Sequence, residues 1–166
     1  MAGAESSLVL SLETPDQPEV IALIEALDAY QASLYPPEAC YRLDISALCQ
    51  PEVLFAVARD SAGVALGCAA IVLGQEAGDG GLPLCVGELK RMVVAPAQRR
   101  QGAAGALLRF LMDQAGQRGC RLLRLETGPY QAEALAFYAR HGFVRCGPFG
   151  SYPEHPLSVF MARPLV

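Results

Sequence analysis

The sequence lacks any apolar run that approaches the roughly 18 uncharged residues of a membrane span. Its first residues, MAGAESSLVLSLETPDQPE, also lack the basic start and long apolar stretch of a secretory signal peptide. We therefore expect a cytoplasmic protein that has no membrane partner.

Paired cysteines are missing as well. Six cysteines are scattered along the chain without a C-x-x-C motif or a nearby histidine pair: Cys40, Cys49, Cys68, Cys85, Cys120 and Cys146. This spacing excludes a disulfide framework and a zinc site, so we expect reduced, mostly buried thiols and no metal. A nucleophilic Cys85 or Cys120 is the alternative left open.

An excess of basic charge is the third absence, because the formal net charge is −4. An acidic chain argues against nucleic acid as a partner, since phosphate contacts need a basic surface. The positive charge that is present lies close together in the sequence: Lys90, Arg91, Arg99, Arg100, Arg109, Arg118, Arg121 and Arg124. This concentration indicates a small anion site, although a solvated basic face explains the last four residues equally well.

The 166 residues, 52% of them apolar, suit one domain over residues 1–166 with a sizeable core. Apolar spacing and turn residues predict a strand over 7–14, an N-capped helix within 14–37, a short helix at 45–50, strands over 53–60 and 63–74, a glycine-rich loop over 75–83, a strand over 84–96, a helix over 103–118, a strand over 121–126, a helix over 130–142 and strands over 143–149 and 157–166. This order predicts an α/β (α+β) fold: a mixed, mostly antiparallel central sheet of six to seven strands with helices on both faces. The connection from 84–95 through 103–118 to 121–126 should be a right-handed crossover between parallel strands.

The segment APAQRRQGAAGALLRF (95–110) places Gly102 and Gly105 at the start of a helix, where each glycine costs about 1 kcal/mol relative to alanine. Small residues at a helix N-terminus let a phosphate approach unpaired N–H groups, and the two adjacent arginines supply counter-charge. The sequence has neither the P-loop motif nor the complete G-x-G-x-x-G fingerprint. A glycine turn that packs helix tightly on sheet remains an alternative.

Two motifs then resemble one family. Arg99-x-x-Gly102-x-Ala104 resembles the R/Q-x-x-G-x-G/A motif of the GNAT superfamily of acetyl-CoA-dependent N-acetyltransferases. QAEALAFYARHGF (131–143) resembles that family's N-x-x-A-x-x-x-Y-x-x-x-G-F helix, with Gln131 where asparagine is frequent. The stretches GELKRMVV, LETG and PLSVFM resemble a group of small bacterial members, and the resemblance covers nearly the whole chain.

The resemblance implies a GNAT-like acyl-CoA N-acyltransferase fold with acetyl-CoA (coenzyme A) as cofactor. Backbone N–H groups at the helix start would hold the pyrophosphate, and the splayed strand before it would pair with the pantetheine arm. The cofactor-binding residues implied in this way are Met92, Val93, Val94, Arg99, Arg100, Gln101, Gly102, Ala103, Ala104, Gly105, Gln131 and Tyr138.

The implied reaction is direct attack of an amine through a tetrahedral intermediate, with a strand N–H near Val93 facing the oxyanion. Tyr138 matches the family tyrosine that is proposed to protonate the leaving thiolate; packing of its ring beside Leu135 is the structural alternative. Glu88 is the first candidate for the general base, directly or through a water, and an ion pair with a neighbouring cation is equally open. Glu126 is the second candidate.

Strict alternation along the strand places Glu88, Lys90 and Met92 on one face and the intervening residues, Arg91 and Val93 among them, on the other. Lys90 or Arg91 would suit a carboxylate, which favours an amino acid or another small acidic amine as acceptor.

The predicted acceptor is the primary amine of a small molecule, because the proline-rich segments 35–37 and 148–156 favour a closed pocket. The predicted substrate-binding residues are Tyr35, Lys90, Arg91, Glu126 and Tyr152, with Tyr30, Tyr41 and Arg42 as further candidates. A protein lysine or N-terminal acetyltransferase and a non-catalytic acyl-CoA-binding regulatory module are the alternatives. A homodimer, common in the family, is an expectation without a direct sign in the chain.

Overall fold

The structure is a computed structural model that describes residues 7–41, 43–98 and 102–165. Seven strands form one sheet in the order β1-β2-β3-β4-β5-β7-β6. The strands are β1 (Val9–Leu12), β2 (Val53–Arg59), β3 (Ala65–Ala77), β4 (Pro83–Val94), β5 (Leu122–Thr127), β6 (Val144–Cys146) and β7 (Val159–Pro164). Only β4 and β5 pair in parallel, and the other neighbours are antiparallel, which confirms the predicted mixed sheet.

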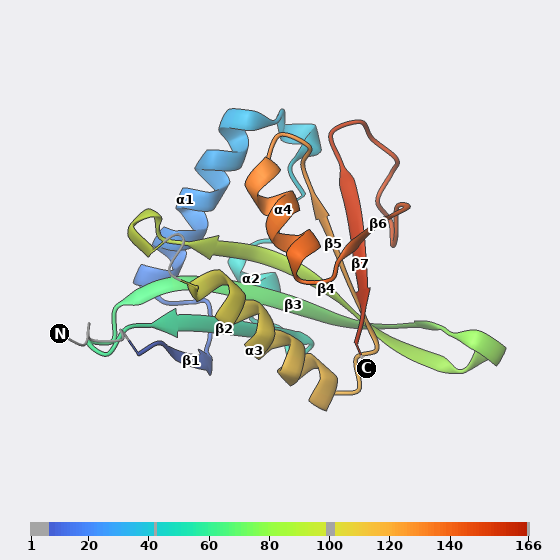
Figure 1. The fold of residues 1–166 in the computed structure, drawn as a ribbon, viewed down its shortest axis with the longest axis horizontal. Helices are drawn as coiled ribbons and strands as arrows, with labels where there is room; N and C mark the ends of the chain where they lie inside the picture. Colours follow the sequence, from blue (N-terminus) through green and yellow to red (C-terminus); the bar gives the residue numbers. More distant parts are fainter. Residues whose placement is uncertain (1–6, 42, 99–101, 166) are drawn as a thin grey trace.

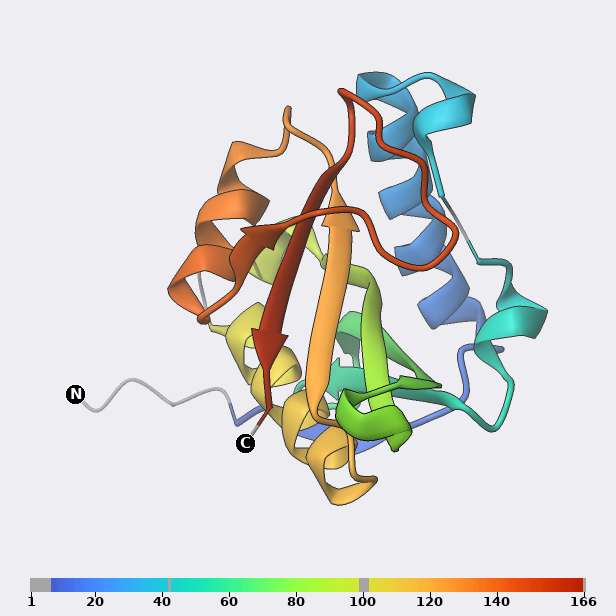
Figure 2. The same ribbon diagram turned by 90° about the vertical axis from the view of Figure 1, so that its right-hand side faces the viewer.

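Helices cover both faces of this sheet, as expected (Figures 1 and 2). One side carries α1 (Pro18–Leu34) and α2 (Ile45–Leu48), and the opposite side carries α3 (Ala103–Gln117) and α4 (Ala132–Arg140). Short 3₁₀ turns form at Pro37–Ala39, Asp79–Gly81 and Pro96–Gln98. Within the described residues, every helix is too short or too polar to span a bilayer.

Two predicted details at the element ends were wrong. The N-cap of α1 is Gln17, which makes no side-chain cap bond, and Pro18 opens the helix instead. Proline suits that position because its fixed φ is helical and it has no N–H to satisfy. The glycine-rich loop over 75–83 is also shorter than expected, because β3 continues to Ala77 and β4 begins at Pro83.

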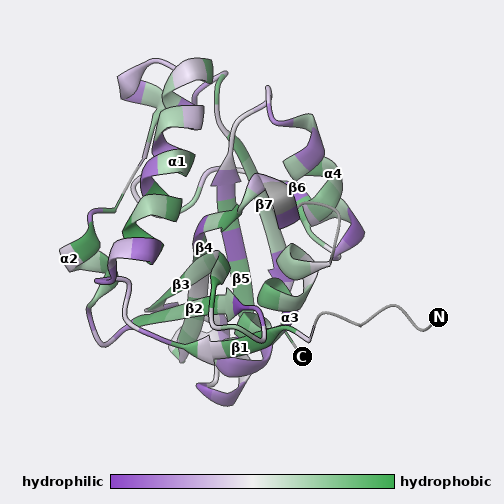
Figure 3. Cartoon of the chain, turned by 90° about the vertical axis from the view of Figure 1, so that its left-hand side faces the viewer, coloured by the Kyte–Doolittle hydropathy of each residue, from purple (hydrophilic) through white to green (hydrophobic). Residues whose placement is uncertain are grey.

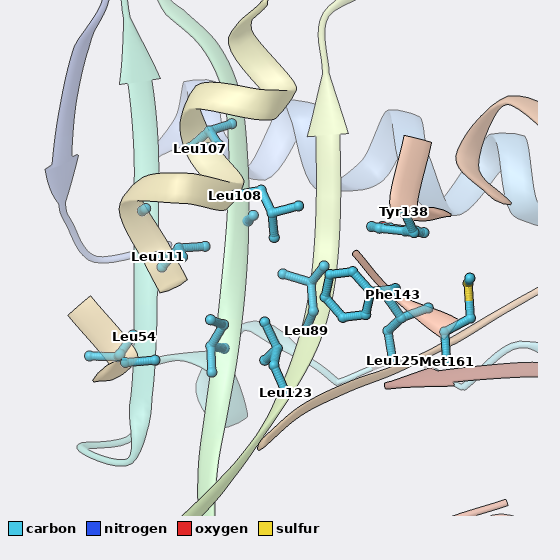
Figure 4. Close-up of a cluster of buried hydrophobic side chains, with 14 of the residues drawn as sticks. Leu54, Leu89, Leu107, Leu108, Leu111, Leu123, Leu125, Tyr138, Phe143 and Met161 are labelled. Atoms are coloured by element: carbon cyan, nitrogen blue, oxygen red, sulfur yellow. The ribbon is translucent and has the colours of Figure 1, made fainter. Parts of the chain in front are cut away.

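The sheet separates two apolar cores. On the α3–α4 side, α3 buries Leu107, Leu108, Leu111 and Ala115 completely, at the spacing that places them on one helix face. Figure 4 shows these leucines facing the strands, with Tyr138 at the edge of the cluster beyond Phe143. On the other side, α1 alternates hydrophobic and hydrophilic segments (Figure 3) and packs on the sheet through residues such as Val20 and Ile24.

The parallel strands β4 and β5 pair over only three residue pairs. Val86, Gly87 and Glu88 pair with Leu122, Leu123 and Arg124, and the ladder then ends. Beyond this point β4 stays paired with β3 as far as Val94, whereas β5 follows β7 as far as Thr127. The sheet therefore has a V-shaped gap in its middle, with one unpaired backbone edge on each side.

A β-bulge lies on β4 beside this gap. Cys68 pairs with Val93 and Ala70 pairs with Lys90, so two residues of β4 lie opposite one residue of β3. The first of the two, Arg91, has a φ of 59°, which a non-glycine residue rarely adopts.

The bulge corrects the strict alternation expected for β4. Met92 and Val94 pack on the α3–α4 core, whereas Val93 packs on the α1–α2 core. Lys90, paired with Ala70 of the α1–α2 core, lies on that same side, and Arg91 reaches α1. One extra residue moves every later side chain to the opposite face.

A close contact joins the end of β5 to the segment after α1. The ring of Tyr35 stacks on Tyr130 at a centroid distance of 5.3 Å, and the Tyr35 hydroxyl accepts a hydrogen bond from the Tyr130 N–H at 3.0 Å. A Cβ added to Gly128 would lie 1.9 Å from the Tyr35 hydroxyl oxygen. Position 128 therefore requires glycine because the ring of Tyr35, 93 positions away in sequence, occupies the space of a side chain, and not because of an unusual backbone conformation at 128.

We predict that Gly128→Ala lowers the free energy of unfolding by about 2 kcal/mol, because the added methyl overlaps the Tyr35 ring. Urea unfolding followed by circular dichroism measures the change. Gly74→Ala in β3 is the matched control, since a Cβ there meets nothing within 4 Å. The cost should fall when Tyr35→Ala removes the ring, and an equal cost in both backgrounds would refute the contact.

Candidate functional site

One continuous cleft of about 930 Å³ lies at the gap between β4 and β5. Its walls come from both faces of the sheet: the C-terminal half of α1 on one side, and the start of α3 with most of α4 on the other. A volume near the upper end of the range for ligand pockets suits an extended ligand together with a second, smaller one. The gap thus connects the two sides of the sheet through its middle.

The first end of the cleft lies at the N-terminus of α3. Gly102 caps the helix with a φ of 83° and has no side chain to bond the free N–H groups of the first turn. Its carbonyl accepts the Ala106 N–H at 3.0 Å, so Ala103, Ala104 and Gly105 form the first turn of α3, where backbone N–H groups precede the regular hydrogen bonds of the helix. A Cβ built at Gly102 would meet nothing within 4 Å, which leaves open space for a ligand. Arg99, Arg100 and Gln101 lie outside the described residues, so their predicted role stays a prediction.

Cations gather next to this helix end. Arg109 and Arg140 line the cleft together with His141, which is the C-cap of α4. Burial lowers the pKa of His141, and the positive charges of Arg109, Arg140 and Arg163 lower it further. Backbone donors and a cluster of positive charge together favour a polyanion at this end.

The middle of the cleft follows the free edge of β4. Met92, Val93 and Val94 line it, and Tyr138 of α4 faces it from the α3–α4 side. The Tyr138 ring is 8% exposed, lies against Phe143 at a centroid distance of 5.7 Å, and has its pKa raised by burial. Among the described residues, no hydrogen bond forms at its hydroxyl, so this group is available to a ligand.

Gln131 and Ala134 extend this wall from α4. Gln131 is the N-cap of α4 but makes no side-chain cap bond, and its side-chain oxygen accepts the Thr127 hydroxyl at 3.4 Å instead. This contact joins the end of β5 to α4 beside the gap.

Tyr152 forms hydrogen bonds with two charged side chains at the opposite end of the cleft. Its hydroxyl donates to Glu88 Oε2 at 2.5 Å and accepts from Lys90 Nζ at 2.9 Å, while Lys90 also lies 3.3 Å from Glu88 Oε2. The Tyr152 ring contacts Tyr41 edge to face at a centroid distance of 5.0 Å. Burial raises the pKa of Tyr152, and the hydrogen bond to Glu88 raises it further, so the phenol stays protonated at neutral pH.

Arg91 lines the same end of the cleft but is held by its neighbours. Its guanidinium forms an ion pair with Asp28 of α1 and donates to the Leu43 carbonyl at 2.8 Å. The Arg91 side chain is only 7% exposed, and its buried Nε has no hydrogen-bond partner among the described residues. These bonds link the bulge of β4 to the helix that covers it.

Glu126 is the carboxylate with the most perturbed acidity in the cleft. Burial raises its pKa from 4.5 to about 7, Glu88 contributes in the same direction, and Lys90 opposes them. At neutral pH the group is therefore divided between its acid and its carboxylate form. A carboxyl group in that state can accept a proton from a ligand and release it again.

The structure brings every described residue of the predicted site to this one cleft. The further candidate Arg42 lies outside the described residues, so its role stays a prediction. Sequence reasoning missed Asp28, because its position in a helix gives no sign that Arg91 is its partner. It also did not predict that Arg109, Arg140 and His141 lie together in one cluster. Cys85 and Cys120 lie outside the cleft lining. Burial raises the pKa of the Cys120 thiol to about 11, which opposes the nucleophile alternative for this residue.

Comparisons with known proteins agree on one family. The acetyltransferase (GNAT) family profile matches residues 20–143. The chain is 42% identical over 159 residues to an IAA acetyltransferase of Azospirillum brasilense, covering 96% of this chain and 99% of that one. It is 32% identical over 149 residues to the N-acetyltransferase YsnE of Bacillus subtilis, and the match covers 89% of this chain and 93% of that one. A crystal structure named as an acyl-CoA N-acyltransferase of Klebsiella pneumoniae superimposes with a TM-score of 0.78 at 37% identity, covering 97% of this chain and 99% of that chain.

We predict that the Glu126 carboxyl titrates with a midpoint near pH 7 in ¹³C NMR spectra of the free protein, with Glu126→Gln used for assignment. Glu88→Gln should lower the midpoint because a like charge is removed, and Lys90→Met should raise it because an opposite charge is removed. Glu25→Gln, on the exposed side of α1, is the control that leaves it unchanged. A midpoint near the ordinary 4.5 would show that the group is not desolvated.

Proposed function

Because the chain belongs to the GNAT family and is an acetyl-CoA-dependent N-acetyltransferase, we propose that it acetylates the primary amine of a small molecule. The observation that carries this proposal is the continuous cleft through the sheet, with helix N–H groups at one end and Glu126, whose pKa is near neutral, at the other. The Azospirillum relative has IAA rather than a protein in its name, which supports an acceptor other than a protein.

The residues at the first end fit coenzyme A. We assign the pyrophosphate to the backbone N–H groups of 102–105, where open space above Gly102 admits it, with Arg109 and Arg140 adding positive charge. The pantetheine arm would lie along Met92–Val94, whose edge lacks a strand partner on the β5 side, and pair with it as an added strand does. Gln131 and Tyr138 would border the arm from α4.

Acetyl-CoA supplies the acetyl group as a thioester when it is bound. Transfer forms a C–N bond to the acceptor and breaks the C–S bond, and the amine must lose a proton while the thiolate gains one. We assign the amine's proton to Glu126, because a pKa of about 7 rather than 4.5 makes proton uptake easier by about 3 kcal/mol. A strand N–H near Val93 remains the proposed oxyanion donor.

Glu88, the first candidate from the sequence, has a different setting. Its carboxylate accepts a hydrogen bond from the Tyr152 hydroxyl and lies 3.3 Å from Lys90 Nζ, so it is already engaged by two neighbouring side chains. We propose that Glu88 positions Tyr152 and Lys90 around the acceptor, and that Glu126 is the base. Tyr138, with a raised pKa, would remain protonated and donate to the thiolate, with a modest effect because a thiol near pKa 8.5 already leaves readily.

Coenzyme A binding tests the first end. Gly102→Glu should raise the Kd for coenzyme A by about 30-fold or more, because it places a carboxylate where the pyrophosphate binds and strains a backbone with φ of 83°. Gly119→Glu is matched in strain, with φ of 84°, but lies at the far end of α3 and should leave the Kd unchanged. Titration calorimetry measures both, and equal affinities in the two variants would place the pyrophosphate elsewhere.

Turnover tests the second end. Free-thiol release from acetyl-CoA across a panel of primary amines should show kcat rising through pH 7, as Glu126 loses its proton. Glu126→Gln should remove that inflection and lower kcat by about 100-fold, whereas Glu88→Gln should keep the inflection. Tyr138→Phe should lower kcat by about tenfold or less.

The reverse pattern between the two glutamate variants would make Glu88 the base. Tight coenzyme A binding without thiol release for any amine would refute the proposed function and favour a regulatory module.

A further inference from the structure

We infer that the acceptor is a cationic primary amine with an aromatic or other flat apolar body and without a carboxylate beside the amine. This inference rests on the proposed function and deepens it. It also opposes the expectation from the sequence, which used Lys90 and Arg91 to favour an amino acid.

The first argument is that the nearby cations already have carboxylate partners. Lys90 Nζ lies 3.3 Å from Glu88 and is bonded to Tyr152, and Arg91 is ion-paired with Asp28. Both side chains are largely buried, at 14% and 7% exposed. A carboxylate on the acceptor would have to displace a bonded carboxylate to reach either cation.

The second argument is the charge that remains after this pairing. Glu126 also lines the cleft and forms no salt bridge with any described residue, and the charge of Glu88 raises its pKa. An ammonium group entering here meets attraction from Glu126 and then a site for its proton. An incoming carboxylate would meet two carboxyl groups in a partly buried space, where like charges repel strongly.

The third argument is the lining around these charges. Tyr30, Tyr35, Tyr41 and Tyr152 border the acceptor end, together with Leu27 and Leu157. Tyr152 is held by its ring contact with Tyr41 and by the hydrogen bonds at its hydroxyl, so its orientation is fixed. Tyr35 is 6% exposed and already stacks on Tyr130, so it contributes only a rigid wall. Fixed aromatic faces favour a flat apolar body and a neighbouring ammonium group.

Matched acceptors test the inference with the wild-type enzyme. Phenethylamine and phenylalanine differ only by the carboxylate, and phenylalaninamide has nearly the bulk of phenylalanine without its charge. We expect kcat/KM to be at least about tenfold higher for phenethylamine and for phenylalaninamide than for phenylalanine, since like-charge repulsion in a desolvated site is strong. Equal or better use of phenylalanine would overturn the inference while leaving the proposed function intact.

Cyclohexylethylamine and n-butylamine carry the same ammonium group as phenethylamine but a different apolar part, so they test the contribution of the apolar body alone. Cyclohexylethylamine, whose ring is puckered rather than flat, should be used less well than phenethylamine. n-Butylamine should be used at least about tenfold less well, because its short chain gives the tyrosine faces little to contact. A preference for butylamine would overturn the apolar-body part of the inference. Failure of every amine would refute the proposed function instead.

Variants then test the pairing itself. Asp28→Asn leaves Arg91 without its carboxylate, and Glu88→Gln does the same for Lys90, so each should narrow the ratio of kcat/KM between phenethylamine and phenylalanine by about threefold or more. Glu25→Gln on the exposed side of α1 is the matched control that keeps the ratio. Thermal unfolding confirms that each variant is folded, and a ratio unchanged in both folded variants would overturn the charge argument.

Discussion

The early end of pairing between β4 and β5 is the constraint on which the site depends. A parallel ladder that stopped later would fill the gap with backbone hydrogen bonds and leave no route through the sheet. Here it stops at Glu88 and Arg124, while each strand remains paired on its other side. Unpaired edges are costly inside a protein unless a ligand or water satisfies them, so the gap suits a ligand that can act as a strand.

The bulge at Arg91 converts that gap into a site with two different sides. Because one extra residue is inserted, Met92 and Val94 join the α3–α4 core while Lys90 and Arg91 both lie on the α1 side. Polar groups therefore collect where α1 and the segment before β7 close the cleft. The positive φ of Arg91 is tolerated because Asp28 and the Leu43 carbonyl fix its side chain.

The order of elements, the buried stripe of α3 and the anion-binding turn were all predictable, because each depends on local periodicity or on small residues at a helix start. The bulge was not predictable, because arginine is not a residue type typical of turns. The bulge depends instead on the register of β4 with β3 and on the contact of Arg91 with α1. The need for glycine at 128 arises from Tyr35, far away in sequence. The acidity of Glu126 was also beyond sequence reasoning, because its pKa depends on burial and on Lys90, Glu88 and Ser158, all distant from it in sequence.

Glu88 and Glu126 show why residue type alone does not assign a role. Both lie on the same face of the sheet, on the two strands that border the gap, and both were base candidates from the sequence. Glu88 accepts a hydrogen bond from a phenol and lies next to an ammonium group, whereas Glu126 is buried, which raises its pKa by favouring the neutral form. The two ends of the cleft therefore differ in the sign of their charge: Arg109 and Arg140 line one end, and the carboxyl groups of Glu88 and Glu126 line the other. An anionic cofactor and a cationic acceptor would each be drawn to its own end, so that the thioester and the amine meet in the gap between the strands.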